Sequence, residues 1–463
     1  MRVVTFGLFA ATALCACTVG PSFKQPDSPA PAGYLNSDES LPGGPAAAAE
    51  QSAPTASDFG QHVLLGATPA ALWWRLFQSQ PLDEVIRRAT SNNHTLAAAR
   101  STLLEAQELV TAESGARYPQ VSVDAGAGRQ KYGAQFEGPL YLSPFTYLAV
   151  GATVSYTLDY TGKIARSVEQ RLALAQYQWS EADAAYLTLT GNVALQAMMI
   201  ASTRAQLQAV SELLAEDRDN LKLVRTAFQN GSVSKTDVLT ADSQLASDET
   251  LLPPLYHQLA LARHALAVLV GQTPADWSPP DFELDEITLP RELPVSLPSE
   301  LVHRRPDILA AEAQLHAATA AVGIATANLY PQITLTAAGG QQAVPATAWQ
   351  LFDRSGAAWS LISGLTAPIF DGGTLRADRR AAIDELQASA ERYQQTVLES
   401  FGQISDLLDA LNQDAENLAA QTRALATAAS SLAALLRASS TVSFPCNPSE
   451  IRRVRPPRPP ILY

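Results

Sequence analysis

The sequence is poor in cysteine and in positive charge, and both shortages exclude classes of protein. It has 3 cysteines in 463 residues, two of them at Cys15 and Cys17, so a disulfide framework is excluded. Its 32 Lys and Arg against 45 Asp and Glu give a net charge of −13. This balance argues against nucleic acid as a partner, because phosphate binding needs clustered basic residues. After the N-terminus there is no uncharged apolar run of about 20 residues, so a membrane-spanning helical bundle is not expected.

The sequence also lacks a set of residues that would carry out chemistry. No constellation of a nucleophile with a base is apparent. The histidines are scattered, without the spacing typical of a metal site, at His62, His94, His257, His264, His303 and His316. We therefore expect no enzyme activity, no catalytic residue, no metal and no cofactor.

Proline is absent from one long stretch, Gly162 to Asn230, and Gly191 is the sole glycine between those ends. At 1.5 Å per residue it would form a helix roughly 100 Å long, which a compact soluble domain does not need. Apolar residues, together with Gln196, Thr203 and Asp217, form a continuous seam along one side of this helix. The apolar residues recur at steps of three and four, as in a coiled coil, at Tyr186, Leu189, Val193, Ile200, Leu207, Val210, Leu214, Leu221, Val224 and Phe228.

The N-terminus has the features of an export signal. Arg2 precedes an apolar run, and Leu14-Cys15-Ala16-Cys17 resembles a bacterial lipobox. We expect residues 1–16 to be a lipoprotein signal peptide and Cys17 to carry an S-diacylglycerol and an N-acyl group. An ordinary signal peptide with an incidental cysteine is the alternative. Residues 17–67 comprise the lipidated N-terminus and a tether. From Lys24 to about Ala67 this segment is rich in Pro, Ala, Gly and Ser, and we expect it to be extended and poorly structured.

The remainder contains two copies of one unit, expected at 68–272 and 299–440 and joined by a linker at 273–298. The heptad seam recurs with an offset of 211 residues, so that Ile404 takes the place of Val193 (404 − 193). Gly162–Arg166 recurs as Gly372–Arg376. Arg117-Tyr118-Pro119-Gln120-Val121 also recurs, as Leu329-Tyr330-Pro331-Gln332-Ile333.

Each copy predicts the order helix, strand, loop, strand, long helix. The first helices are expected at Leu82–Gly115 and Ser299–Asn328, each ended by a proline. In copy one a second helix, Val233 to Gly271, returns antiparallel to the long helix, with a break at Pro253-Pro254.

Two strands per copy alternate apolar residues with small or polar ones. The second strand of copy two is expected to continue through Ala367 and Ile369. Such strands suit a transmembrane barrel with a wet interior, whereas a soluble two-faced sheet gives the same alternation. Four strands cannot close a barrel, and open edges are not tolerated in lipid, so other subunits are required; three chains give twelve strands. The expected lipid-facing residues are Val121, Val123, Val150, Val154, Tyr156, Leu158, Ile333, Leu335, Leu361 and Leu365.

Several motifs resemble the outer-membrane efflux factors, the TolC/OprM-like family, and specifically its NodT-type RND efflux lipoproteins. The resemblance covers about Cys17 to Arg437. The motifs are Trp73-Trp74 with Phe77 and Leu82-Asp83, Arg304-Arg305-Pro306-Asp307-Ile308 with Ala311-Glu312 and Leu315, Ala321-Val322-Gly323-Ile324-Ala325, Phe370-Asp371-Gly372-Gly373, and the helical turn Phe228, Gly231, Ser234, Asp237 with Val238-Leu239.

The resemblance implies a mainly α, internally duplicated fold. Long antiparallel helical hairpins would form an α-barrel, and a small β part would contribute four strands per chain to a 12-stranded trimeric transmembrane β-barrel. It also implies a homotrimeric duct in the outer membrane of a Gram-negative bacterium, lipid-anchored and extending into the periplasm. The duct would dock on a periplasmic adaptor (membrane fusion) protein and an inner-membrane RND pump, and it would export small molecules such as drugs. The turn at Phe228, Gly231, Ser234 and Asp237 would lie at the periplasmic tip. A type I secretion-like duct for protein export and a structural periplasmic coiled-coil lipoprotein are the alternatives.

Copy two departs from copy one near its end. After Arg437 the sequence should repeat the turn at Gly231, but residues 441–463 are basic and Pro-rich, with no helical period. We interpret this tail as the product of a frameshift near Ala438, with a natural extension as the alternative. Translating the other frames downstream of codon 438 tests this hypothesis.

Overall fold

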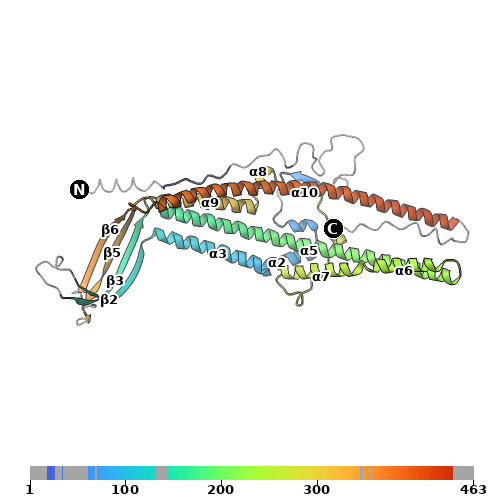
Figure 1. Ribbon diagram of the computed structural model, residues 1–463, viewed down its shortest axis with the longest axis horizontal. Helices are drawn as coiled ribbons and strands as arrows, with labels where there is room; N and C mark the ends of the chain where they lie inside the picture. The colour runs from blue at the N-terminus through green and yellow to red at the C-terminus, as the bar shows by residue number, and fades with distance from the viewer. Residues whose placement is uncertain are drawn as a thin grey trace. The chain divides into compact units, whose positions relative to one another are not determined.

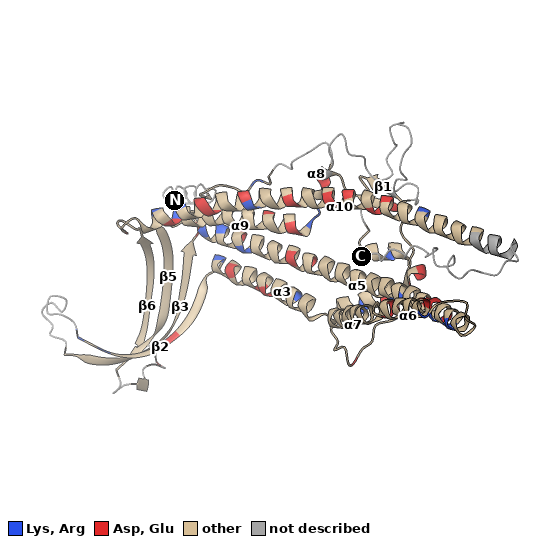
Figure 2. Cartoon of the chain, turned by 45° about the vertical axis from the view of Figure 1, so that its right-hand side comes forward, with Lys and Arg blue, Asp and Glu red and all other residues tan. Residues whose placement is uncertain are grey.

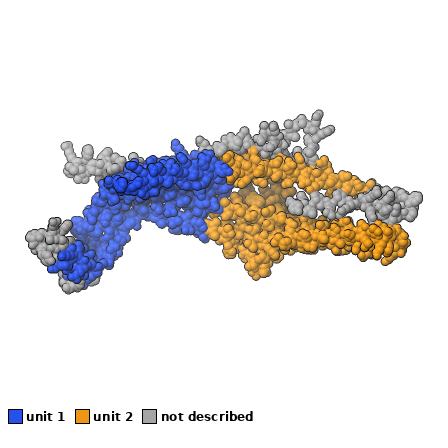
Figure 3. All heavy atoms as spheres, in the orientation of Figure 1, with its two compact units in different colours: residues 1–27, 101–181, 306–396 blue, residues 28–100, 182–305, 397–463 orange. Residues whose placement is uncertain are grey.

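The chain forms a mostly helical protein with one antiparallel sheet (Figure 1). Contacts divide it into two compact units (Figure 3). Unit 1 comprises residues 1–27, 101–181 and 306–396, and unit 2 comprises 28–100, 182–305 and 397–463. The computed structural model describes residues 18–26, 34, 61–67, 70–131, 143–344, 348–349, 351, 353 and 356–441.

The sheet lies within unit 1 and has the order β2-β3-β5-β6, with every neighbouring pair antiparallel. Its strands are β2 (Gln120–Gln130), β3 (Phe145–Leu158), β5 (Gln332–Ala343) and β6 (Ala357–Thr366). The prediction that the last strand includes Ala367 and Ile369 is wrong for the isolated chain. The pairing of β5 with β6 ends at Gln332 opposite Thr366, so residues beyond 366 have no partner on β5.

Two long helices follow the strand pairs. Helix α5 (Lys163–Gln229) follows β3, and α10 (Thr374–Thr441) follows β6. Both start after a glycine with positive φ, Gly162 at 76° and Gly373 at 92°. The two helix starts differ by 211 residues (374 − 163), the offset of the heptad seam. The counterpart of Gly162 is therefore Gly373, one residue later than the motif alignment with Gly372 predicted.

The first helix of each copy is divided in two, which corrects both predicted spans. Leu82–Gly115 is α2 (Gln80–Asn92) and α3 (His94–Ser114), because Asn93 is extended. The Asn93 side chain accepts a hydrogen bond from the Leu96 N–H at 2.9 Å, so it caps α3. Ser299–Asn328 is α8 (Pro298–Leu301) and α9 (Pro306–Ala327), since Pro306 disfavours helix at the residue before it.

Helix α9 in unit 1 buries many small side chains. On α9 the buried residues include Ala310, Ala313, Ala317 and Ala320, which allow close approach of neighbouring backbone. By length and composition alone, α9 and α5 could each cross a membrane. In α9, however, 56% of the apolar window is buried inside the chain, as in the core helix of a water-soluble protein.

The core of unit 2 forms where α2, α5 and α7 (Leu252–Leu269) meet. Helix α2 buries one stripe at helical spacing, Leu82, Val85, Ile86 and Ala89. The 3₁₀ helix η2 (Trp73–Phe77) adds Trp74, whose indole N–H donates to Asp83 at 2.9 Å. That hydrogen bond, aided by the neighbouring arginines, holds the pKa of Asp83 below its ordinary value.

Residues 24–67 were predicted to be a poorly structured tether, but the described residues of this range include a strand and defined contacts. Strand β1 (His62–Leu65) pairs in parallel with β4 (Glu292–Val295) in unit 2. In the same unit Tyr34 donates from its hydroxyl to the Ser296 carbonyl at 2.8 Å, and the Ser405 hydroxyl donates to the Tyr34 carbonyl at 2.6 Å. Composition did not reveal these contacts, because they use backbone atoms and single side chains.

Candidate membrane-facing sheet and helical tip

The strand register places all ten predicted lipid-facing residues on one face of the sheet. Directly opposed residues of antiparallel strands share a face. Val121 opposes Val154, and Val154 in turn opposes Ala337 on β5. Further pairs on the same face are Tyr156 with Leu335, Leu158 with Ile333, Ile333 with Leu365, Ala337 with Leu361, Ala152 with Val123, and Val150 with Ala125.

This apolar face is exposed in the single chain. Eight of the ten predicted residues are exposed, and Trp359 on the same face is 84% exposed. Tyr156 and Ile333 are half-buried. Exposed apolar patches of this kind mark a surface that meets lipid or another protein.

The opposite face of the sheet is small and polar. Its residues are mainly Ser, Thr, Gln, Gly and Ala, and Gly151 opposes Gly340 there. Across the four strands the charged residues are Asp124, on the polar face, and Arg129, near the end of β2 on the apolar face. Figure 2 shows that the charged residues otherwise concentrate on the helices.

The helical turn after α5 contains the four residues predicted to form the tip. Helix α5 ends at Gln229, and Gly231 has a φ of 71°. Its N–H donates to the Phe228 carbonyl at 2.9 Å, and the Ser232 N–H donates to the Ala227 carbonyl at 2.9 Å. These two bonds form a Schellman motif, which requires the left-handed conformation that glycine adopts at low cost.

Helix α6 (Lys235–Glu249) begins with a reciprocal cap. The Ser234 hydroxyl accepts from the Asp237 N–H at 3.3 Å, and the Asp237 carboxylate accepts from the Ser234 N–H at 3.0 Å. Arg225–Asp242 at 3.0 Å and Arg218–Glu249 at 3.2 Å then join α5 to α6 along the hairpin. The turn therefore has a defined geometry, although Phe228 stays largely exposed.

The predicted acylation site, Cys17, lies outside the described residues. Residues 18–26, which follow Cys17, pack against other parts of unit 1. The Val19 N–H donates to the Thr161 carbonyl at 3.0 Å, and the Phe23 ring stacks on His316 at 4.3 Å between centroids. Gly20 lies against Gly323, where a side chain on Gly20 would come within 2.6 Å of the Gly323 Cα.

A charged cluster in unit 1 was missed by the sequence reasoning. Arg166, on α5, is buried and pairs with Glu169 at 2.6 Å, and Glu169 also contacts His316 Nε2 at 3.1 Å. Burial of a charge is costly unless it is paired. The spacing Arg166-x-x-Glu169 on one helix face was the available signal.

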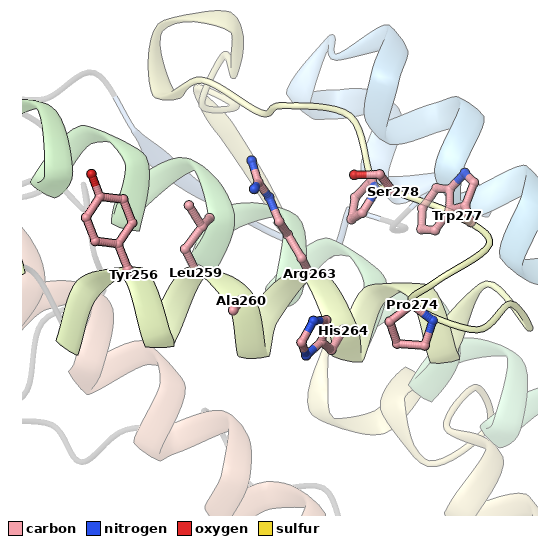
Figure 4. Close-up of a pocket in the computed structure, with 9 residues that line it drawn as sticks. Tyr256, Leu259, Ala260, Arg263, His264, Pro274, Trp277 and Ser278 are labelled. Carbon is pink, nitrogen blue, oxygen red and sulfur yellow. The ribbon is translucent and has the colours of Figure 1, made fainter. Parts of the chain in front are cut away.

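In unit 2, a hollow of about 240 Å³ separates α7 from residues 274–279 (Figure 4). Arg263 lines it and pairs with Asp281 at 2.6 Å, while Arg88 lies 5.4 Å above the Trp277 ring. These contacts hold Asp281 of the predicted linker against α7 and Trp277 of the linker against α2. The other residues lining it are Tyr256, Leu259, Ala260, His264, Pro274, Ser278 and Pro279.

Comparison with known proteins assigns the family. The sequence profile described as Outer membrane efflux protein matches residues 85–272 and 297–439. The pyoverdine export outer membrane protein OpmQ of Pseudomonas aeruginosa is 31% identical over 350 residues, 73% of this chain and 72% of its own length. The toluene efflux pump outer membrane protein TtgF of Pseudomonas putida is 29% identical over 433 residues, 91% of this chain and 84% of its own.

A solved structure agrees with the assignment. The outer-membrane channel OprN superposes with a TM-score of 0.79 at 25% identity, covering 92% of this chain and 91% of OprN. The matched fold is the TolC-like one expected from the sequence, mainly helical with a smaller β part. The chain therefore belongs to the outer membrane efflux protein family, the efflux channels of the Gram-negative outer membrane.

Proposed function

We propose that this efflux channel is the outer-membrane duct of a tripartite RND-type system that exports small molecules from the periplasm. Three copies form a homotrimer, which docks on a periplasmic adaptor protein and an inner-membrane RND pump. The relatives named for toluene and pyoverdine export support a small-molecule cargo.

The observation that carries the proposal is the two-faced sheet of unit 1. One face is apolar and exposed, and the other is small and polar, as in a barrel with lipid outside and water inside. Among the described strands, β2 and β6 each have one pairing neighbour. Because unpaired backbone groups are not tolerated in hydrocarbon, further copies must complete the ring. Three chains give a twelve-stranded barrel.

The helical turn at Phe228, Gly231, Ser234 and Asp237 forms the periplasmic tip in this proposal. Its two caps hold α5 and α6 as a rigid hairpin. Opening of the channel is then a repacking of hairpins against one another, and the turn itself stays intact.

Acylation of Cys17 anchors the mature chain to the outer membrane. Three acyl chains at about 0.8 kcal/mol per buried methylene would make the anchor firm. Labelled palmitate should enter the chain and be absent from a Cys17→Ser variant. Equal labelling of the variant would exclude this anchor.

Export is tested by deleting the gene and measuring growth with a panel of antibiotics, dyes and solvents. We expect hypersensitivity to several compounds, reversed by the wild-type chain. A Val154→Lys variant should fail to restore resistance, because a lysine facing lipid costs up to about 2–4 kcal/mol, depending on its depth in the bilayer. Ser155→Lys, its neighbour on the polar face, is the matched control and should restore resistance.

The two other functions predict different outcomes. If the protein is a secretion duct, deleting its gene would leave drug sensitivity unchanged, and an exported protein would disappear from the medium. A structural coiled-coil lipoprotein would give neither heat-modifiable trimers nor conductance in a planar bilayer. Either result would replace the efflux proposal.

A further inference from the structure

We propose a specific register for the seam between copies: β6 of one chain pairs antiparallel with β2 of the next, with Leu365 opposite Ala125. This inference rests on the proposed trimer and adds the residue-level contact that closes it. It also assigns residues 367–369 to strand β6, but only in the assembled ring.

The register follows from the internal repeat. Strands β2 and β5 begin 212 residues apart, at Gln120 and Gln332, so Val121 corresponds to Ile333. Val121 opposes Val154, and Ile333 opposes Leu365. Leu365 is therefore the counterpart of Val154, at an offset of 211 (365 − 154). The same offset separates the starts of α5 and α10.

Within one chain, the junction between the two repeats provides a template for the seam between chains. Strand β3, which ends copy one, pairs with β5, which begins copy two, and Val154 lies opposite Ala337. In a closed ring, β6 meets β2 of the next chain in the same relation. The counterpart of Val154 is Leu365 and that of Ala337 is Ala125 (337 − 212), which gives the proposed pair.

The proposed register keeps the two faces of the sheet continuous. Ala125 lies on the apolar face, opposite Val150, and Leu365 lies on the same face, opposite Ile333. A slip of one residue would turn every apolar side chain of the next copy toward the polar face. A slip of two residues preserves the faces, so it is the competing arrangement that an experiment must exclude.

The register also explains why β6 is short. Strand β3 continues past its pairing with β2, which ends at Ser155, and pairs with β5 as far as Leu158. The counterpart of Leu158 is Ile369, three residues past the present end of β6. Ile369 is 93% exposed in the single chain and would oppose Val121 of a second copy.

One contact of the internal seam has no equivalent. The Tyr160 hydroxyl donates to the Pro331 carbonyl beside the β3–β5 pair. Its counterpart is Asp371 (160 + 211), whose carboxylate instead accepts from the Gly373 and Leu375 N–H groups. A carboxylate cannot donate to a carbonyl, so the seam between copies lacks this hydrogen bond.

Cysteine cross-linking in membranes of cells expressing the full chain tests the register. The variant Leu365→Cys/Ala125→Cys, in a Cys446→Ser background, should form covalent dimers and trimers on oxidation. Directly opposed positions lie about 4.5–5.5 Å apart between Cβ atoms and diagonal positions about 7–8 Å. The slipped pairs Leu365→Cys/Ala127→Cys and Leu365→Cys/Val123→Cys should therefore cross-link at least about fivefold more slowly.

The internal seam provides a matched control. Val154→Cys/Ala337→Cys occupies the equivalent positions within one chain and should oxidise at a comparable rate without forming oligomers. If a slipped pair cross-links faster, or no pair does while the protein sediments as a trimer, the register is wrong. If the purified protein sediments as a monomer, the proposed trimer itself fails.

Discussion

Helices α5 and α10 have matching seams but very different surroundings. On α5, within unit 2, the seam residues Ile200, Leu207, Leu214 and Leu221 are 0–9% exposed. Their counterparts on α10, 211 residues later, are leucines that are 36–64% exposed: Leu411, Leu418, Leu425 and Leu432. At Ile200 and Leu207 the α5 seam packs in one core with α2 and α7, and ion pairs join its later part to α6. An apolar heptad pattern therefore marks a surface that needs a partner, and the partner decides whether the surface is buried.

Grafting onto α10 the turn and helices that follow α5 should have the largest effect on this contrast. In the graft, residues 227–269 replace residues 438–463, following the 211-residue offset. Covering four leucines at about 25 cal/mol per Å² should stabilise α10 by on the order of 5 kcal/mol. Urea midpoints and amide exchange along α10 measure the gain. A graft with Leu255→Lys and Leu259→Lys is the control, and equal midpoints for both grafts would contradict the prediction.

Truncating matched seam residues should affect the two helices unequally. Leu214→Ala should lower the free energy of unfolding by about 2–5 kcal/mol, because a buried leucine leaves a cavity. Leu425→Ala, at the equivalent but exposed position, should cost less than about 1 kcal/mol. Urea denaturation of the two purified variants measures the difference. Similar losses would show that α10 has a partner in solution.

Removing the cap at the α5–α6 turn should have a smaller effect. Ser234→Ala should cost about 1 kcal/mol, because the Asp237 N–H loses its side-chain acceptor and keeps only the Ser234 carbonyl. Ser232, in the same turn, makes no such cap, so Ser232→Ala should be nearly neutral. Amide exchange at residues 235–240 reports the fraying directly. Unchanged protection in Ser234→Ala would mean that packing alone holds the turn.

The smallest effect concerns the start of α10. Hydrogen bonds from the Leu375 and Gly373 N–H groups lower the pKa of Asp371 below its ordinary value. The cap is therefore fully present above the unfolded-state pKa, about 3.9, and is lost as the pH falls through the lower folded-state pKa. Exchange at Leu375 should accelerate in strong acid relative to a neighbouring turn of the helix. Asp371→Asn should abolish that pH dependence, while Asp378→Asn should retain it.

Features with a period or a distinctive residue could be predicted from the sequence. Alternation predicted the faces on which Val154 and Leu365 lie, and the register agrees. Gly231 followed three residues later by Ser234 predicted the turn, and the backbone has the Schellman motif and the cap. The repeat required the same fold in both copies, and the structure has the same order of strands and long helix in each.

Features that depend on single contacts could not be predicted. The packing of Gly20 on Gly323 and the pairing of β1 with β4 leave no periodic trace in a Pro- and Ala-rich segment. The break at Asn93 could have been recognised from the adjacent polar residues Ser91 and Asn92, since Asn is favoured as a helix cap. In the proposed seam the end of β6 depends on a partner strand, and one chain's sequence does not state which strand that is.

The sheet register has a geometric consequence for the barrel. Val121 lies opposite Val154, and Val154 lies opposite Ala337. Ala337 is four residues beyond Ile333, which is the residue that corresponds to Val121 in the second copy. Two strands thus accumulate a stagger of four residues (337 − 333). With about 3.3 Å per residue and 4.8 Å between strands, the strands of a closed ring would tilt by roughly 50° from its axis. Each residue then advances only about 2 Å across the bilayer, so a 25 Å apolar band needs about 12 residues. The strands have 10 to 14.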